Sequence, residues 1–333
     1  MATEHSRSQL FNTGAQVNSV VSAAPPPGSQ TIKVGTSGFS YPEWKGPFYP
    51  EKLPQQQMLE FYARHFPAVE INSTYYHIPP PRNMAAMAKR AEGRVEFSVK
   101  AHQDMTHTRD KYAEALPSFR AALAPMREAG VLGCVLVQFP FSFKATAANT
   151  DFLRRIASDL APDPVAVEIR HRSWTTDETF ALLRDLGVVY CCVDEPRLPN
   201  LPPPVVRATS SIAYVRFHGR NRQKWWTHAE AWERYDYLYS EAELLEWVPK
   251  IRSLAEATQK CYAFFNNHAR GQAVTNAQML INLLSAGWGA RLADPISPPL
   301  PCSPAPGPRY CWPEVPDIRP RASSLLRLER NLC

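Results

Sequence analysis

Charged and imidazole side chains occur in pairs, two residues apart, at the ends of apolar runs in this sequence. Residues two apart on a strand lie on the same face, so each pair can present both groups to one site. The pairs are Glu70 with Asn72, Lys100 with His102, Glu168 with Arg170, and Arg216 with His218. Carboxylates and imidazoles transfer protons or hold a metal, and cationic side chains neutralise phosphate. The pattern predicts acid–base or phosphate chemistry where these strand ends meet.

A structural role is the alternative for the same groups. Glu168 with Arg170, and Lys100 with Glu70, have the types expected of ion pairs that only hold strand ends together. Burying many charged groups without a function is costly, so for the whole set we favour a site. The chain has no HxxxH spacing, and we keep a divalent metal as a candidate cofactor without assigning ligands.

The elements that carry these pairs alternate regularly. The apolar runs predict strands, and the 3.6-residue patterns between them predict helices. The strands are expected at 32–36, 68–72, 95–101, 131–139, 165–169, 188–193, 212–217 and 261–265, and the helices at 55–66, 84–92, 112–130, 151–160, 177–187, 241–258 and 272–285. Most strands are continuously apolar, as in a parallel sheet covered on both faces. We predict a (β/α)8 TIM barrel, with a doubly wound open sheet as the alternative, and a barrel would gather all the strand ends at one mouth.

Two of the connections depart from the regular alternation. Residues 195–211 carry five prolines and no helical pattern, and residues 219–240 are an insertion rich in aromatic and basic side chains. The loop at 37–50 is also rich in aromatic residues, including Trp44. Such loops can stack on bases or sugars, or pack their own aromatics as a lid, and the sequence leaves both readings open.

Composition divides the chain into three parts. Its 333 residues include 32 prolines, and these concentrate near the C-terminus. Because helices and strands tolerate proline poorly, that segment is not expected to form regular elements. We expect a disordered N-terminal extension at 1–31, one barrel domain at 32–287 and a Pro-rich disordered tail at 288–333. The net charge of +6 is too small to indicate nucleic-acid binding by itself. No signal peptide or membrane span is recognisable, so a soluble, cytoplasmic protein that does not bind membranes is expected, with its oligomeric state open.

Several separated strings resemble one known family. GTSGFSYPEWKGPFYP, VEIRHRSW, YVRFHGRN and YAFFNNHARGQAVTNA occur in the order found in the YecE-like family, domain-of-unknown-function family 72, and the resemblance spans roughly residues 32–286. The resemblance implies a TIM barrel related in shape to the metal-dependent xylose isomerase and endonuclease IV group. It brings no established reaction.

The strand-end pairs and the resemblance together give the expected site. We expect four catalytic residues: Glu70, Lys100, Glu168 and His218. The residues expected to bind substrate are Asn72, His102, Gln138, Arg170, His171, Trp174, Arg216, Asn266, Asn267 and Trp44. The leading hypothesis is a hydrolase, in its sharpest form a metal-dependent nuclease or phosphodiesterase, acting on a phosphate-bearing substrate. The alternatives are a non-catalytic barrel that binds nucleic acid or a sugar-phosphate, and a sugar isomerase or aldolase that uses Lys100.

Overall fold

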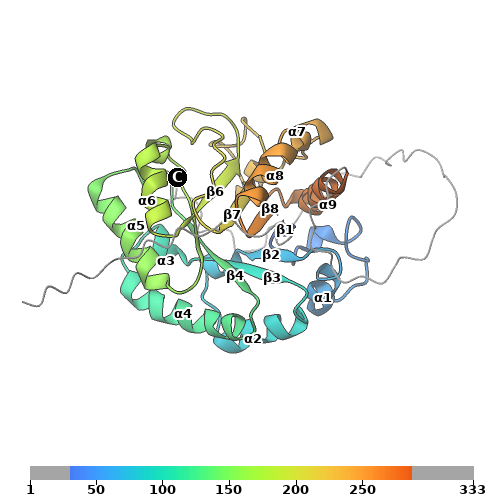
Figure 1. Ribbon diagram of the computed structural model, residues 1–333. Helices are drawn as coiled ribbons and strands as arrows, with labels where there is room; N and C mark the ends of the chain where they lie inside the picture. Colours follow the sequence, from blue (N-terminus) through green and yellow to red (C-terminus); the bar gives the residue numbers. More distant parts are fainter. Residues whose placement is uncertain (1–30, 287–333) are drawn as a thin grey trace, which may run out of the picture.

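Eight parallel strands close into a barrel in the computed structural model, which describes residues 31–286 (Figure 1). The strands are β1 (Thr31–Ser37), β2 (Ala68–Ile71), β3 (Glu96–Lys100), β4 (Leu132–Gln138), β5 (Val165–Glu168), β6 (Val189–Asp194), β7 (Ile212–Phe217) and β8 (Lys260–Phe265). They follow one another around the barrel in chain order, and β1 pairs with β8 to close it. The prediction of a (β/α)8 barrel is confirmed, and the open-sheet alternative is wrong.

Helices surround the barrel on its outer side (Figure 1). They are α1 (Met58–Tyr62), α2 (Pro81–Arg90), α3 (Gln103–Thr106), α4 (Tyr112–Glu128), α5 (Ala147–Leu160), α6 (Asp177–Asp185), α7 (Glu241–Leu245), α8 (Val248–Glu256) and α9 (Gln272–Ser285). Side-chain caps begin four of them, at His102, Thr146, Thr176 and Ser240. The helix predicted at 241–258 is divided in two, because Pro249 has no N–H for a continuous helix and instead occupies the start of α8.

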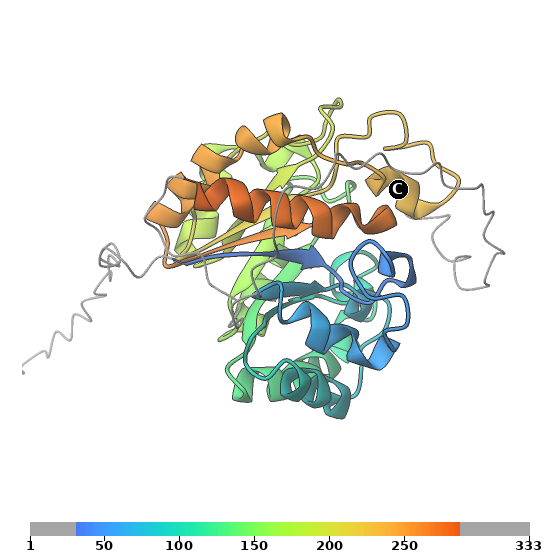
Figure 2. The same cartoon turned by 90° about the vertical axis from the view of Figure 1, so that its right-hand side faces the viewer.

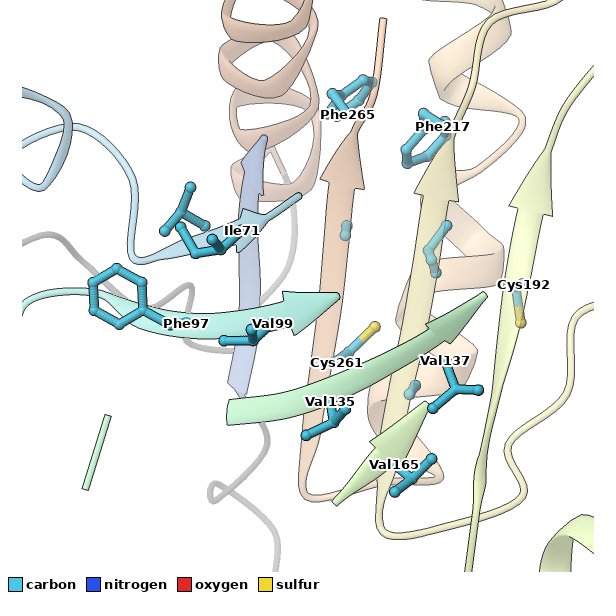
Figure 3. Packing of buried hydrophobic residues seen from close by; sticks show 14 of the residues in the cluster. Ile71, Phe97, Val99, Val135, Val137, Val165, Cys192, Phe217, Cys261 and Phe265 are labelled. Atoms are coloured by element: carbon cyan, nitrogen blue, oxygen red, sulfur yellow. The ribbon is translucent and has the colours of Figure 1, made fainter. Parts of the chain in front are cut away.

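The main hydrophobic core lies between the barrel and the helices. Figure 3 shows alternate residues of neighbouring strands, such as Val135 and Val137 of β4, on this outer side. The residues between them form a second, smaller cluster that includes Cys134, Leu136 and Tyr214. This alternation places Glu70, Lys100, Glu168 and Arg216 on the inner side of the strands, as the two-residue spacing predicts.

The amino ends of the strands are also polar, contrary to a simple division between an apolar start and a polar end. Glu96 accepts hydrogen bonds from Lys260 Nζ at 2.9 Å and from the Tyr262 hydroxyl, and pairs with Lys33 Nζ at 3.0 Å. Glu96 and Lys260 are the first residues of β3 and β8, and the alternation along these strands turns both toward the barrel interior. The Glu96 carboxylate thus joins two lysines and a tyrosine at the end of the barrel opposite the mouth.

The long loops after β1 and β7 lie at the end to which the strand arrows point (Figure 2). The segment at 195–211 contains no helix, as expected, and residues 219–240 hold only a short 3-10 helix at Ala231–Tyr235. Among residues 31–286 no helix is long and apolar enough to cross a membrane. The predicted N-terminal extension and Pro-rich tail lie outside the described residues.

Candidate functional site

Arg216 of β7 is the centre of a buried polar cluster inside the barrel. Its Nη2 donates to Glu70 Oε1 at 2.6 Å, and its Nη1 donates to Glu168 and, at 3.2 Å, to Gln138 Oε1. The Arg216 side chain is only 1% exposed. The second oxygen of Glu70 accepts a hydrogen bond from the Tyr214 hydroxyl at 2.7 Å. The cluster joins β2, β4, β5 and β7, and it leaves the carboxylate of Glu70 with no free oxygen.

Both carboxylate oxygens of Glu168 also accept hydrogen bonds from arginine side chains. Its Oε1 accepts from Arg170 Nε at 2.8 Å while its Oε2 receives Arg216. Burial alone would raise the pKa of Glu168, but Arg216, His218 and Arg170 outweigh burial and hold that pKa well below its usual range. Glu168 is therefore a charged carboxylate at neutral pH. These contacts favour a positioning role for Glu168 and Glu70 over the proton transfer expected from the sequence.

His218 lies beside Glu168 as a neutral imidazole. Burial lowers the pKa of His218 to about 4, although Glu168 acts in the opposite direction. The Asn266 amide nitrogen lies 3.2 Å from His218 Nδ1. With that amide donating, the ring proton sits on Nε2, which faces Glu168 Oε1 at 3.3 Å without the alignment of a hydrogen bond.

Lys100 ends β3 on the inner side of the barrel and has no compensating charge in contact. Within the described residues its Nζ makes no ion pair, and it lies 4.3 Å from the centroid of the Tyr75 ring. Burial, followed by the nearby cations Arg216 and Arg170, lowers the pKa of Lys100 to about 7. A large fraction of Lys100 is therefore an uncharged amine at neutral pH, able to act as a base, a nucleophile or, once protonated, an anion-binding group.

Glu195 is a member of this site that the sequence analysis did not select. It follows β6, and burial raises its pKa to about 8, with Glu168 and Asp194 adding to the effect and Arg170 opposing it. Glu195 is thus mainly a neutral carboxylic acid at pH 7. The strand-end rule that selected Glu168 applies equally to Glu195, but no spacing in the sequence shows which of two consecutive acids, Asp194 or Glu195, faces inward.

Asp194 faces outward and has a different role. It accepts hydrogen bonds from the Tyr239 hydroxyl and from Trp247 Nε1, both at 2.7 Å, and from Arg220 Nη2 at 2.8 Å. The side-chain amide of Asn276 on α9 accepts a hydrogen bond from the Tyr239 backbone N–H and donates one to the Tyr239 carbonyl. These contacts fix the two stems of the β7–α7 loop, which comprises residues 218–240.

The β7–α7 loop reaches over the barrel mouth. The ring centroid of Tyr235 lies 6.0 Å from that of His218 and 6.2 Å from that of His268. Burial would raise the pKa of Tyr235, but Arg170 and Arg234 outweigh it and lower that pKa. Trp225 is 1% exposed, whereas Trp226 and Trp232 are 40% and 38% exposed. Tyr239 is also buried, and Tyr235 and Tyr237 are half-buried, which favours a loop packed on itself as a lid.

The mouth also contains buried polar atoms without a hydrogen-bond partner among the described residues. They follow five different strands and are Ser37 Oγ, Asn72 Oδ1, Glu195 Oε1, His218 Nε2 and His268 Nδ1. Buried polar groups are normally hydrogen-bonded, because an unmade bond costs on the order of 1–3 kcal/mol. Their concentration at one end of the barrel is what a bound polar ligand or water would satisfy.

The other predicted substrate-binding residues make local contacts. His102 and His171 accept hydrogen bonds from backbone N–H groups at the starts of short helices. Trp44 Nε1 donates to the His268 carbonyl, and Trp174 Nε1 donates to the Phe143 carbonyl, both at 2.7 Å. Asn267 Nδ2 donates to the Tyr237 carbonyl at 2.8 Å. These side chains hold the loops of the mouth in place, and no contact brings them into the Arg216 cluster.

The carboxylates of the mouth do not fit a divalent cation. Within residues 31–286 no three side chains of His, Cys, Asp or Glu lie together as a metal-binding group. The oxygens that a cation would need, on Glu70 and Glu168, are occupied by Arg216, Arg170 and Tyr214. The site offers charged and neutral acid–base groups of the protein itself.

Three comparisons place this barrel among known proteins. A family model described as "Protein of unknown function DUF72" matches residues 33–299. The UPF0759 protein YunF of Bacillus subtilis (strain 168) is 33% identical over 252 residues, which cover 71% of this chain and 89% of that protein. A DUF72 family protein from Thermotoga maritima MSB8 has a similar structure, with a TM-score of 0.71 and 40% identity over 77% of this chain and 99% of that one. A second, from Enterococcus faecalis V583, has a TM-score of 0.69 and 27% identity over 77% and 96% of the two chains. The resemblance found in the sequence strings is confirmed, and the chain belongs to the DUF72 family.

Proposed function

We propose that the protein is an enzyme that hydrolyses a phosphate ester of a small polyhydroxylated molecule at the barrel mouth. The observation that carries the proposal is Lys100, an amine without an ionic partner among the described residues, whose pKa burial and the cations Arg216 and Arg170 lower to about 7. A bound anion would relieve this repulsion. The unpartnered polar atoms around the mouth suit the hydroxyl groups of such a substrate.

Lys100 and Glu195 would act as base and acid. In the proposed step the neutral Lys100 amine takes a proton from water as the water oxygen bonds to phosphorus. The P–O bond to the leaving alcohol breaks, and the protonated Glu195 gives its proton to the leaving oxygen. Arg170, which Glu168 keeps charged against the effect of burial, would stabilise charge on the phosphoryl oxygens. Two groups whose environments move their pKa values toward neutrality in opposite directions are typical of acid–base catalysis.

A panel of phosphate monoesters and diesters, including sugar phosphates and oligonucleotides, tests the proposal. We expect phosphate release by the native protein and at least a roughly 100-fold lower kcat in Lys100→Met and Glu195→Gln. Lys89→Met and Glu128→Gln, at exposed positions on α2 and α4, are the matched controls and should retain full activity. If Lys100→Met and Glu195→Gln were as active as the controls on every hydrolysed substrate, the mechanism would be wrong.

A lyase that forms a Schiff base is the second candidate, favoured by the same lowered pKa of Lys100. A neutral lysine amine adds to a carbonyl carbon and loses water to form an imine. Borohydride treatment in the presence of ketose and aldose phosphates would reduce that imine to a stable amine, so Lys100 would gain the mass of the substrate less one oxygen atom. Trapping on Lys100 would favour the lyase, and its absence together with phosphate release would favour the hydrolase.

A further inference from the structure

A pocket of about 270 Å³ opens beside the carboxyl end of β6, on the side of the loop rich in proline. Pro196, Pro202 and Pro204 form an apolar wall. Its other lining residues are Val193, Asp194, Glu195, Arg197, Arg220, Arg222, Glu246 and Lys250. The volume is just below the range typical of drug-sized ligands, so a small molecule would fill it.

The charges around this pocket do not cancel. Arg220 has acidic partners, because it pairs with Asp194 at 2.8 Å, with Glu246 at 3.0 Å and with Glu243 at 3.4 Å. Arg197 and Arg222 have no acidic partner within the described part of the chain. The ammonium of Lys250 contacts a ring instead of a carboxylate, with Nζ 4.8 Å from the Trp247 centroid.

We propose that this side pocket is a second binding site, separate from the barrel mouth, for a small phosphate monoester with an apolar body. Four cations line the pocket against the carboxylates of Asp194 and Glu246, with Glu195 neutral, and this excess of positive charge favours a doubly charged head group over a carboxylate. The proline wall offers contact area for the apolar part of the ligand.

Glu195 connects the side pocket with the proposed catalytic centre. It lines the pocket, and its ionisation responds to Arg170 and Glu168 of the barrel interior. An anion bound in the pocket would add negative charge near Glu195 and favour its protonated form. The pocket site itself rests on the lining residues and does not depend on the proposed hydrolysis.

Calorimetric titration with phenyl phosphate, inorganic phosphate and benzoate tests the pocket. We expect saturable binding in the order phenyl phosphate, inorganic phosphate, benzoate, since only the first has both a dianionic head and an apolar body. The double variant Arg197→Gln/Arg222→Gln should bind phenyl phosphate at least about ten-fold more weakly. Both side chains are exposed and have no acidic partner in the described region, so the fold should be unaffected.

Two further variants test whether the ligand binds in the pocket and not at the barrel mouth, and whether binding depends on these arginines and not on the total charge of the protein. Arg82→Gln/Arg154→Gln removes the same charge from exposed positions on α2 and α5 and should bind like the native protein. Lys100→Met should retain the pocket site even if it loses a site at the mouth. Unchanged affinity in Arg197→Gln/Arg222→Gln, loss of all binding in Lys100→Met, or equal affinity for benzoate and phenyl phosphate would each overturn the proposal.

Discussion

In the proposed mechanism, the chemistry of the barrel depends on two residues, Lys100 and Glu195. If they are base and acid, activity needs the deprotonated amine and the protonated carboxyl. The rate should therefore fall below about pH 7 as Lys100 gains its proton, and above about pH 8 as Glu195 loses its own. We expect a narrow bell-shaped dependence of kcat/KM on pH with its maximum between these values. A profile that rises steadily from about pH 6 to about pH 10 would exclude this assignment.

We expect substitution of Glu168 to lower the stability of the fold. It is 1% exposed and neutralises both Arg216 and Arg170, so Glu168→Gln leaves two buried cations undercompensated. We expect the free energy of unfolding, measured by urea titration, to drop by about 3–5 kcal/mol.

The Arg90–Glu60 pair provides a matched comparison for this variant. Arg90 Nε lies 2.7 Å from Glu60 Oε1, but both side chains are well exposed, at 38% and 34%. Glu60→Gln should therefore cost about 1 kcal/mol or less. Equal losses for Glu168→Gln and Glu60→Gln would show that the buried cluster is not what holds the barrel interior together.

The sequence predicted which residues face the barrel interior more reliably than what they do. The two-residue spacing placed Glu70, Glu168, Arg170 and Arg216 on one side of their strands, because strand geometry alone determines that alternation. Their roles depend on which oxygen each cation occupies, and those contacts join strands far apart in the chain. Glu195 was missed for the same reason, since only its burial beside Glu168 distinguishes it from Asp194.

At the scale of elements, the β7–α7 loop decides access to the mouth. Gly219, at its start, has a φ of +89°, and a Cβ there would lie 2.7 Å from the Tyr237 Cβ. Gly219→Ala should therefore displace the returning segment of the loop as well as strain the backbone. We expect faster tryptic cleavage after Arg220, Arg222 and Lys224, and a higher KM for the hydrolysed substrate.

Gly130 supplies the control for the loop variant. It also has a positive φ, of +68°, but a methyl group added at that position would have no neighbouring atom within 4 Å. Gly130→Ala should cost about 1 kcal/mol of stability without changing cleavage of the β7–α7 loop. Similar proteolysis patterns for the two variants would contradict a specific role for the Gly219–Tyr237 contact.

The elements themselves were largely predictable, and their irregularities were not. Helix α9 has the predicted bounds, since a clear apolar stripe lies between Gly271 and Ala286. The short helix α3 was missed, because its four residues depend on the His102 cap and are too few to show a periodic pattern. The sequence left open whether the aromatic side chains of the β7–α7 loop stack on a ligand or pack together as a lid. The burial of Trp225 and Tyr239 inside the protein favours the lid.

For the molecule as a whole, buried histidines predict a loss of stability in mild acid. Burial lowers the pKa of His218 and of His268 to about 4 and that of His107 to about 3. The unfolded chain binds these protons near about pH 6.5, so protons favour unfolding as the pH falls below that value. We expect the urea midpoint to fall between about pH 6.5 and pH 5, before most carboxylates titrate. A midpoint that stays constant or rises over this range would contradict the burial of neutral imidazoles.

The central claim is that the barrel mouth holds a lysine poised to exchange its proton at neutral pH. NMR titration of the protein with 13C-labelled lysine side chains measures this directly, with Lys100→Met identifying the resonance of Lys100. We expect the Cε signal of Lys100 to titrate at about pH 7 and added phosphate to move this titration to higher pH. A Lys100 signal that titrates near about pH 10, with the other lysines, would contradict the account.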